Sequence, residues 1–239
     1  MDLKEFNELF EKEISNNNIK LNIRDYEKFY IYMKEIIEWN DKINVTAITD
    51  EKEFLVKHLI DSLTINGFVG SGKSLIDIGT GAGFPGIPLK IANPELNVTL
   101  IDSVNKKLNV IRNVSEKMNL EKLEIIHTRA EDLANQKEYR ENFDFATTRA
   151  VSRLNTIAEY MLPFVKVGGC AICMKGPNVI EEIEEAKKAI EVLGGEIIDV
   201  KKLVIDNEYE RNIVIISKKK STPKQYPRGK GKPAKEPIK

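Results

Sequence analysis

Residues 75–86 read Leu-Ile-Asp-Ile-Gly-Thr-Gly-Ala-Gly-Phe-Pro-Gly, a short apolar run that ends in glycines at alternate positions. This pattern is typical of a buried parallel strand that turns sharply into a helix. Gly79, Gly81 and Gly83 lack a Cβ atom, so a ligand can approach the backbone of the turn closely. The helix that follows would present free N–H groups and the positive end of its dipole. We therefore predict a binding site for a polar small molecule at this glycine turn.

Two other motifs overlap this stretch. Residues 67–74 match the phosphate-loop pattern GxxxxGK[ST], which requires a helix at its end; here a strand-like run follows Ser74, so we interpret the match as a linker. Residues 81–86 match the dinucleotide fingerprint GxGxxG, but that fingerprint should begin where the strand stops. The pattern that begins at Gly79 is GxGxG preceded by Asp77, the signature of S-adenosylmethionine-dependent methyltransferases. A nicotinamide-dependent oxidoreductase is the first alternative.

The composition is that of one large domain or one domain with appendages, since the chain has 239 residues. Cys170 and Cys173 form a C-x-x-C motif inside an apolar, strand-like run. We interpret them as buried structural cysteines and not as a redox pair. A signal peptide and a long apolar span are both lacking, so we expect a cytoplasmic protein with no membrane partner.

Residues 1–67 are predicted to form three helices. The second carries an aromatic stripe at helical spacing, including Phe29 and Tyr30, which we assign to the core and not to a base-stacking platform. We expect Asn22 to cap this helix. The third begins with a capping box at Asp50-x-x-Glu53.

Strands alternate with helices from residue 74 onward. The expected strands are residues 75–78, 98–101, 123–127, 143–147, 170–175, 196–205 and 211–217, and the expected helices are residues 87–92, 106–118, 153–165 and 181–193. A short polar turn joins the last two strands, so these should be antiparallel. The fold class is therefore α/β, a doubly wound, mostly parallel seven-stranded sheet of the Rossmann-like, class I methyltransferase type. We divide the chain into an N-terminal helical extension (1–70), a catalytic domain (71–217) and a basic tail (218–239).

Polar residues follow several strands at the edge where such sheets bind ligands. Asp102 ends the second strand and could accept hydrogen bonds from both hydroxyls of a ribose, of either candidate cofactor. Glu131 follows the third strand and Arg149 the fourth; the alternative for this pair is a weak surface ion pair. His58 and Asp61 are three residues apart on the third helix. Their spacing favours a surface pair or a helix cap, and the alternative is a pair that faces the ligand cleft.

The chain resembles the bacterial ribosomal RNA small subunit methyltransferase G family, also called glucose-inhibited division protein B. The resemblance runs through Trp39-Asn40-x-x-Ile43-Asn44-x-Thr46, His58-x-x-Asp61-Ser62-Leu63, the stretch from Asp77 to Gly86, Arg129-Ala130-Glu131, Thr148-Arg149-Ala150 and Thr222-Pro-Lys-x-Tyr-Pro-Arg228. It covers nearly the whole chain.

This resemblance implies methylation of a guanine N7 in 16S ribosomal RNA, within the small ribosomal subunit or its precursor. We expect a monomeric enzyme that needs no metal. The resemblance also implies S-adenosylmethionine as the cofactor. The cofactor contacts that it implies are Gly79, Phe84, Ala130, Glu131 and Arg149, to which the glycine-turn residues Asp77, Gly81 and Gly83 and the strand-end acid Asp102 are added from the sequence pattern.

Guanine N7 carries an exposed lone pair, so methyl transfer to it needs alignment and no general base. Donors aimed at guanine O6 would help to hold the base. Arg149 and Lys175 are our candidate donors, with His58 and Asp61 as wall residues. The second alternative is a non-catalytic RNA-binding or ribosome-assembly factor that keeps a cofactor fold.

The charge is unevenly distributed, although the net charge is zero. Residues 218–239 contain nine Lys or Arg and one acid, a net charge of +8, which leaves 28 basic and 36 acidic residues elsewhere. The tail is rich in Pro, Gly and Lys, so we expect it to be mobile without RNA. Its predicted phosphate contacts are Lys218, Lys219, Lys220, Lys224, Arg228, Lys230 and Lys232. The alternative is a merely solvated end.

Overall fold

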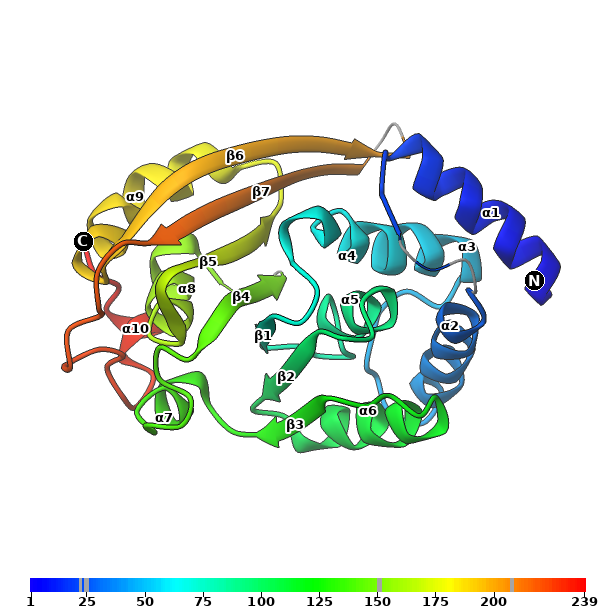
Figure 1. The fold of residues 1–239 in the computed structure, drawn as a ribbon, viewed down its shortest axis with the longest axis horizontal. Coiled ribbons are helices and arrows are strands. Elements are labelled where there is room, and N and C mark those ends of the chain that lie inside the picture. The colour runs from blue at the N-terminus through cyan, green and yellow to red at the C-terminus, as the bar shows by residue number, and fades with distance from the viewer. Residues whose placement is uncertain (22, 24–25, 150–151, 207–208) are drawn as a thin grey trace.

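The computed structural model describes residues 1–239 except 22, 24–25, 150–151 and 207–208. Its centre is a seven-stranded sheet of order β3-β2-β1-β4-β5-β7-β6, flanked by helices (Figure 1). Neighbouring strands are parallel from β3 to β5, and β7 is antiparallel to both β5 and β6. Strand order reverses between β1 and β4, which places the expected ligand site at their carboxyl ends.

The strands are β1 (Ser74–Ile78), β2 (Asn97–Asp102), β3 (Leu123–His127), β4 (Phe143–Arg149), β5 (Val165–Lys175), β6 (Gly195–Ile205) and β7 (Tyr209–Lys218). The helices are α1 (Leu3–Asn16), α2 (Glu27–Asn40), α3 (Glu51–Phe54), α4 (Asp61–Leu63), α5 (Gly86–Ala92), α6 (Asn105–Lys117), α7 (Ala130–Leu133), α8 (Leu154–Met161), α9 (Val179–Val192) and α10 (Lys232–Lys235). A π-helical segment, Leu55–Ile60, joins α3 to α4, and a 3₁₀ turn, Asn66–Phe68, precedes β1.

All seven predicted strands and their antiparallel ending are confirmed. The third helix begins where expected, because the Asp50 carboxylate accepts hydrogen bonds from the backbone N–H groups of Lys52 and Glu53. Two short helices, α7 and α10, were not predicted. Asn22, the expected cap of the second helix, lies outside the described residues, and α2 begins at Glu27.

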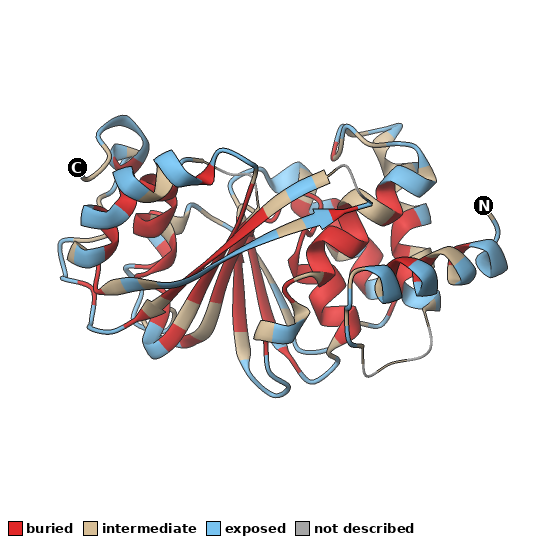
Figure 2. Ribbon diagram, turned by 90° about the horizontal axis from the view of Figure 1, so that it is seen from above, coloured by how far each residue is buried: buried red, intermediate tan, exposed pale blue. Residues whose placement is uncertain are grey.

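Successive residues of the central strands enter two separate cores, because side chains alternate across a sheet. Leu75 packs with α2, α5 and α6, whereas its neighbour Ile76 packs with α8 and α9. Buried residues therefore run along the middle of the sheet and the inner faces of the helices, while exposed residues lie on the outer helix faces (Figure 2). This double burial explains why β1 reads as a continuous apolar run.

The N-terminal helices pack directly on the catalytic sheet. The aromatic stripe of α2 is core as predicted: Phe29 and Tyr32 are both fully buried, and they share one core with Leu75 of β1. The Tyr32 hydroxyl donates a hydrogen bond to the carbonyl of Ala82 in the glycine turn. The N-terminal helical extension therefore helps to hold the glycine turn in place.

The C-terminal segment packs against α8, which contradicts the expectation of a mobile tail. Lys218 is only 1% exposed and donates a hydrogen bond to the Thr222 hydroxyl, at 2.6 Å. Arg228 forms a two-pronged ion pair with Glu159 of α8, with nitrogen–oxygen distances of 2.9 and 2.7 Å. Figure 1 shows the segment folded back beside α7 and α8. Polar side chains and carbonyl groups hold it in place, and Tyr226 and Ile238 pack against the core that contains α8 and α9. The Pro-, Gly- and Lys-rich composition gave no sign of these contacts.

This packing divides the predicted phosphate contacts into two groups. Lys218 is buried and Arg228 is paired with Glu159, so neither offers a free charge to RNA in this arrangement. The remaining members are exposed: Lys219, Lys220, Lys224, Lys230 and Lys232.

Cys173 is buried and Cys170 half-buried, and both thiols are free, as the sequence suggested. Burial raises the pKa of Cys173 to about 12. Within the described residues, none of the helices combines the length and the apolar character needed to cross a bilayer.

Candidate cofactor and substrate site

The glycine turn contains two kinds of glycine. Gly83 and Gly86 are packed from behind: a Cβ on Gly83 would lie 2.7 Å from the Tyr32 hydroxyl, and one on Gly86 would lie 2.3 Å from Leu100. A Cβ on Gly81 would meet nothing within 4 Å, although its φ of +59° favours glycine. Gly81 therefore marks the open side of the turn, and the other two glycines allow the turn to sit closely on the core.

Asp77 lies beneath this turn and is fully buried. One of its oxygens accepts hydrogen bonds from the Thr80 hydroxyl and the Gly86 N–H, at 2.7 and 3.0 Å. Burial raises the pKa of Asp77 to about 7, although the two hydrogen bonds lower it. The structure thus gives Asp77 a role in holding the turn. Its direct contact with the cofactor stays a prediction.

A cavity of about 250 Å³ opens at the carboxyl ends of β1, β2 and β3. Four of the predicted cofactor residues line it: Gly79, Asp102, Ala130 and Glu131. The Asp102 carboxylate is fixed by hydrogen bonds from the N–H groups of Gly81 and Val104, at 2.9 and 2.8 Å. A rim carboxylate held in this way suits a ribose, because each oxygen has a second lone pair for a hydroxyl donor.

Glu131 and Tyr160 form the far wall of the cavity. Glu131 is 4% exposed, and its carboxylate accepts a hydrogen bond from the Gly231 N–H of the C-terminal segment. Burial and the nearby Glu131 charge raise the pKa of the Tyr160 hydroxyl. The sequence left open a surface ion pair between Glu131 and Arg149. This pair does not form, because Glu131 accepts from Gly231 and Arg149 pairs with Asp61.

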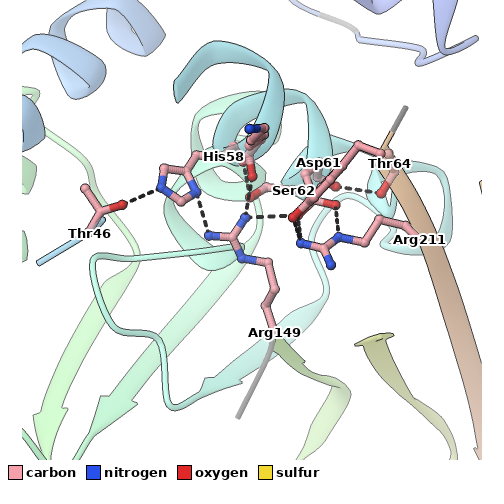
Figure 3. Close-up of polar contacts among 9 residues, drawn as sticks. Thr46, His58, Asp61, Ser62, Thr64, Arg149 and Arg211 are labelled. Carbon is pink, nitrogen blue, oxygen red and sulfur yellow. Dashed lines mark hydrogen bonds and ion pairs between the residues drawn. The ribbon is translucent and has the colours of Figure 1, made fainter. Parts of the chain in front are cut away.

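On the opposite side of β1, a buried cluster surrounds Arg149 at the end of β4 (Figure 3). Its guanidinium donates to the Asp61 carboxylate at 3.0 Å, to the Lys57 carbonyl at 2.9 Å and to His58 Nδ1 at 2.9 Å. Asp61 also binds Arg211 of β7, which donates from Nε at 3.0 Å and from Nη2 at 3.2 Å. The Asp61 side chain is fully buried, so this carboxylate is shared by two guanidiniums.

His58 is held as a neutral imidazole. Its Nδ1 accepts from Arg149, so the proton lies on Nε2, which points at the Thr46 hydroxyl 2.6 Å away. Burial and the Arg149 charge lower the pKa of His58 to about 3. The ring stacks on Phe84 of the glycine turn with centroids 4.3 Å apart, and the Arg149 guanidinium lies 4.7 Å from the same phenyl centroid. Phe84 therefore links the glycine turn to the Arg149 cluster.

The surface pair favoured for His58 and Asp61 is wrong, since both residues are buried in this cluster. Lys175 lies elsewhere: it donates to the Ser152 carbonyl and pairs with Glu182 of α9. Strand alternation directs Lys175 to the α8–α9 face, whereas Arg149 faces the N-terminal helices. Arg211 was missed, because it is the first residue of the predicted strand 211–217 and a charged residue at the end of a strand gives no sign of burial.

Comparisons with known proteins identify the family. The family model described as rRNA small subunit methyltransferase G matches residues 25–214. The protein of that name from Clostridium botulinum (strain Eklund 17B / Type B) is 46% identical over 237 residues, covering 98% of this chain and 99% of its own. That from Alkaliphilus oremlandii is 43% identical over 240 residues, covering 98% and 100%.

Solved structures agree on the fold. A SAM-dependent methyltransferase from Aquifex aeolicus matches with a TM-score of 0.54 at 17% identity, over 72% of this chain and 96% of its own. TrmK from M. capricolum, solved with S-adenosylhomocysteine, matches with a TM-score of 0.53 at 18% identity, over 68% and 69%. The nicotinamide alternative finds no support in the family match. The chain belongs to the rRNA small subunit methyltransferase G family and is an S-adenosylmethionine-dependent rRNA methyltransferase.

Proposed function

We propose that the enzyme methylates N7 of a guanine in 16S ribosomal RNA. The position and the base come from the family resemblance, and one structural observation supports them. In the Arg149 cluster every polar atom that could take a proton is already engaged: both oxygens of Asp61 accept from guanidiniums, and both nitrogens of His58 have partners. A cluster at the strand ends without a free base suits a nucleophile that already carries a lone pair, as guanine N7 does.

The residues of the chain would then act by binding and orientation. When bound, S-adenosylmethionine supplies an electrophilic methyl group. Asp102 would hold the ribose hydroxyls, and the open face of Gly81 would admit the cofactor against the turn. Both contacts lie on the β2 side of β1.

Arg149 lies on the β4 side of β1. We place its guanidinium between the bound cofactor and the target guanine, where it can donate to guanine O6. Two guanidiniums, one carboxylate and a neutral imidazole give the cluster a net charge of +1. His58 and Asp61 position Arg149 through the hydrogen bonds described above. Phe84 fixes the same guanidinium by stacking beneath it.

The natural substrate that we propose is the small ribosomal subunit or its precursor, modified by a monomeric enzyme in the cytoplasm. The exposed lysines of the C-terminal segment are proposed phosphate contacts: Lys219, Lys220, Lys224, Lys230 and Lys232. The target guanine must be accessible in a loop or unstacked to reach a site at the strand ends.

The experiment is to map 7-methylguanosine in 16S RNA from cells with the gene present and deleted. Reduction and aniline cleavage break the chain at that nucleoside, and primer extension reports the position. A stop that disappears in the deletion strain and returns with the wild-type gene is the expected result. An identical stop pattern in both strains would contradict the proposal.

A further inference from the structure

The C-terminal segment lies directly behind one wall of the cavity. Gly231, with φ of +70°, donates its N–H to the Glu131 carboxylate at 3.2 Å. The Pro233 carbonyl accepts a hydrogen bond from the Thr156 hydroxyl of α8, at 3.1 Å. Both wall residues of the cavity, Glu131 and Tyr160, are therefore on elements that this segment touches.

An ion pair anchors the segment just before these contacts. Arg228 donates to both oxygens of Glu159, whose side chain is only 1% exposed, and its own backbone N–H donates to the same carboxylate at 2.7 Å. Glu159 precedes Tyr160 in α8, so the anchor is fixed one residue away from the cavity wall. Arginine is suited to such a two-pronged contact because its donors form a planar fork.

We infer that residues 228–235 are a built part of the cofactor site, and that the Gly231 N–H positions the Glu131 carboxylate against the bound cofactor. This inference rests on the assignment of the cavity to S-adenosylmethionine. Arg129 comes only within 3.9 Å of Glu131, and that arginine side chain is 64% exposed. A buried carboxylate without a close donor changes its orientation or draws in water. Among the residues that the structure describes, the Gly231 N–H is therefore the close donor that keeps the Glu131 carboxylate in place.

The segment also connects this wall to the proposed RNA surface. Lys230 and Lys232 flank Gly231 and are exposed, while the backbone between them contacts Glu131. Side-chain charge and backbone contact can thus be removed separately. This gives a test in which the two functions of the segment are distinguished.

The test measures the affinity for S-adenosylhomocysteine by calorimetry in the absence of RNA, so that failure of the guanine assignment does not affect it. Deletion of residues 229–239 leaves the Arg228–Glu159 ion pair and removes the Gly231 donor. It also removes the carbonyl of Glu236, which accepts from Arg228, and that of Pro233, which accepts from Thr156. We expect the affinity to fall about tenfold, the loss expected for one hydrogen bond to a buried charged group. The triple variant K230A/K232A/K235A is the matched control, which keeps the backbone and should bind the ligand as the wild type does.

A double-mutant cycle with Glu131→Met, which is similar in size but has no oxygen to accept the Gly231 N–H, separates positioning from general damage. The truncation should have less than about a twofold effect when the Glu131 carboxylate is already absent. Gly231→Val, which disfavours the left-handed backbone at this position, replaces the truncation if the shortened chain does not fold. Unchanged affinity in the truncated or Gly231→Val protein would overturn the inference, as would losses that simply add in the cycle.

Discussion

Asp61→Asn keeps the shape of the side chain and removes the charge that two buried guanidiniums share. Asp61 accepts three hydrogen bonds, one from Arg149 and two from Arg211, at 3.0 to 3.2 Å. Both carboxylate oxygens are used. In either orientation the asparagine amide therefore points its own N–H groups at a guanidinium donor.

The size of the loss follows from this geometry. Hydrogen bonds to charged groups are each worth about 1.5–3 kcal/mol, and the asparagine oxygen keeps some of them. The guanidinium side chains are only 10% and 15% exposed, so water cannot replace the lost charge fully. Breaking a buried ion pair from one side costs about 3–5 kcal/mol. We expect the free energy of unfolding to fall by that amount.

Urea denaturation of the wild-type and variant proteins measures this difference. Glu210→Gln is the control, because its pair with Lys202 is on the surface with both side chains exposed, and its loss should be at most about 1 kcal/mol. The double variant D61N/R211Q should regain at least about 0.5 kcal/mol over Asp61→Asn alone, since one uncompensated charge is gone. If Asp61→Asn cost no more than Glu210→Gln, the cluster would not be the buried charge network described above.

Three further predictions concern the turn, the rim and the imidazole. Gly81→Val should abolish S-adenosylmethionine binding in calorimetry while the protein stays folded, whereas Gly86→Ala should lower stability by about 1–3 kcal/mol through overpacking; normal cofactor affinity in the valine variant would refute the placement of the pocket. Asp102→Ala should weaken cofactor binding by about 1–3 kcal/mol with little effect on the methyl-transfer rate at saturation, and an unchanged dissociation constant would exclude Asp102 from the ribose site. His58 has its pKa lowered from 6.5 to about 3, so its contribution to stability is present above pH 6.5 and is lost as the pH falls towards 3. His58→Gln should flatten the acid side of the wild-type stability curve across that range, and parallel curves for the two proteins would contradict a buried neutral imidazole.

The sheet could be predicted from the sequence because its signals are local. The apolar run of β1, the glycines after it and the Asp50 cap each depend on residues within a few positions of one another. The acid at the end of β2 could be placed by the same logic, because the carboxyl ends of parallel strands share one edge of a sheet. Asp102 is accordingly found on the cavity rim.

The Arg149 cluster could not be predicted in the same way. Helical spacing shows that His58 and Asp61 are neighbours, but not which face of the helix is buried. The second arginine on Asp61 is Arg211, 150 residues away along the chain. The packing of the C-terminal segment could not be predicted for a related reason. Its composition suggested mobility, and single polar contacts such as that of Arg228 with Glu159 leave no periodic pattern in the sequence.

The central claim is methyl transfer to a guanine N7, and the product itself tests it most directly. Purified enzyme would be incubated with small subunits from the deletion strain and S-adenosylmethionine carrying a heavy-isotope methyl group. The RNA would then be digested to nucleosides and analysed by chromatography and mass spectrometry against methylated standards. We predict that the heavy label is found in 7-methylguanosine. Label in a nucleoside that is methylated on an exocyclic amine or on a ring carbon would contradict the proposal. The absence of label, with enzyme that is shown to bind the cofactor, would contradict it as well.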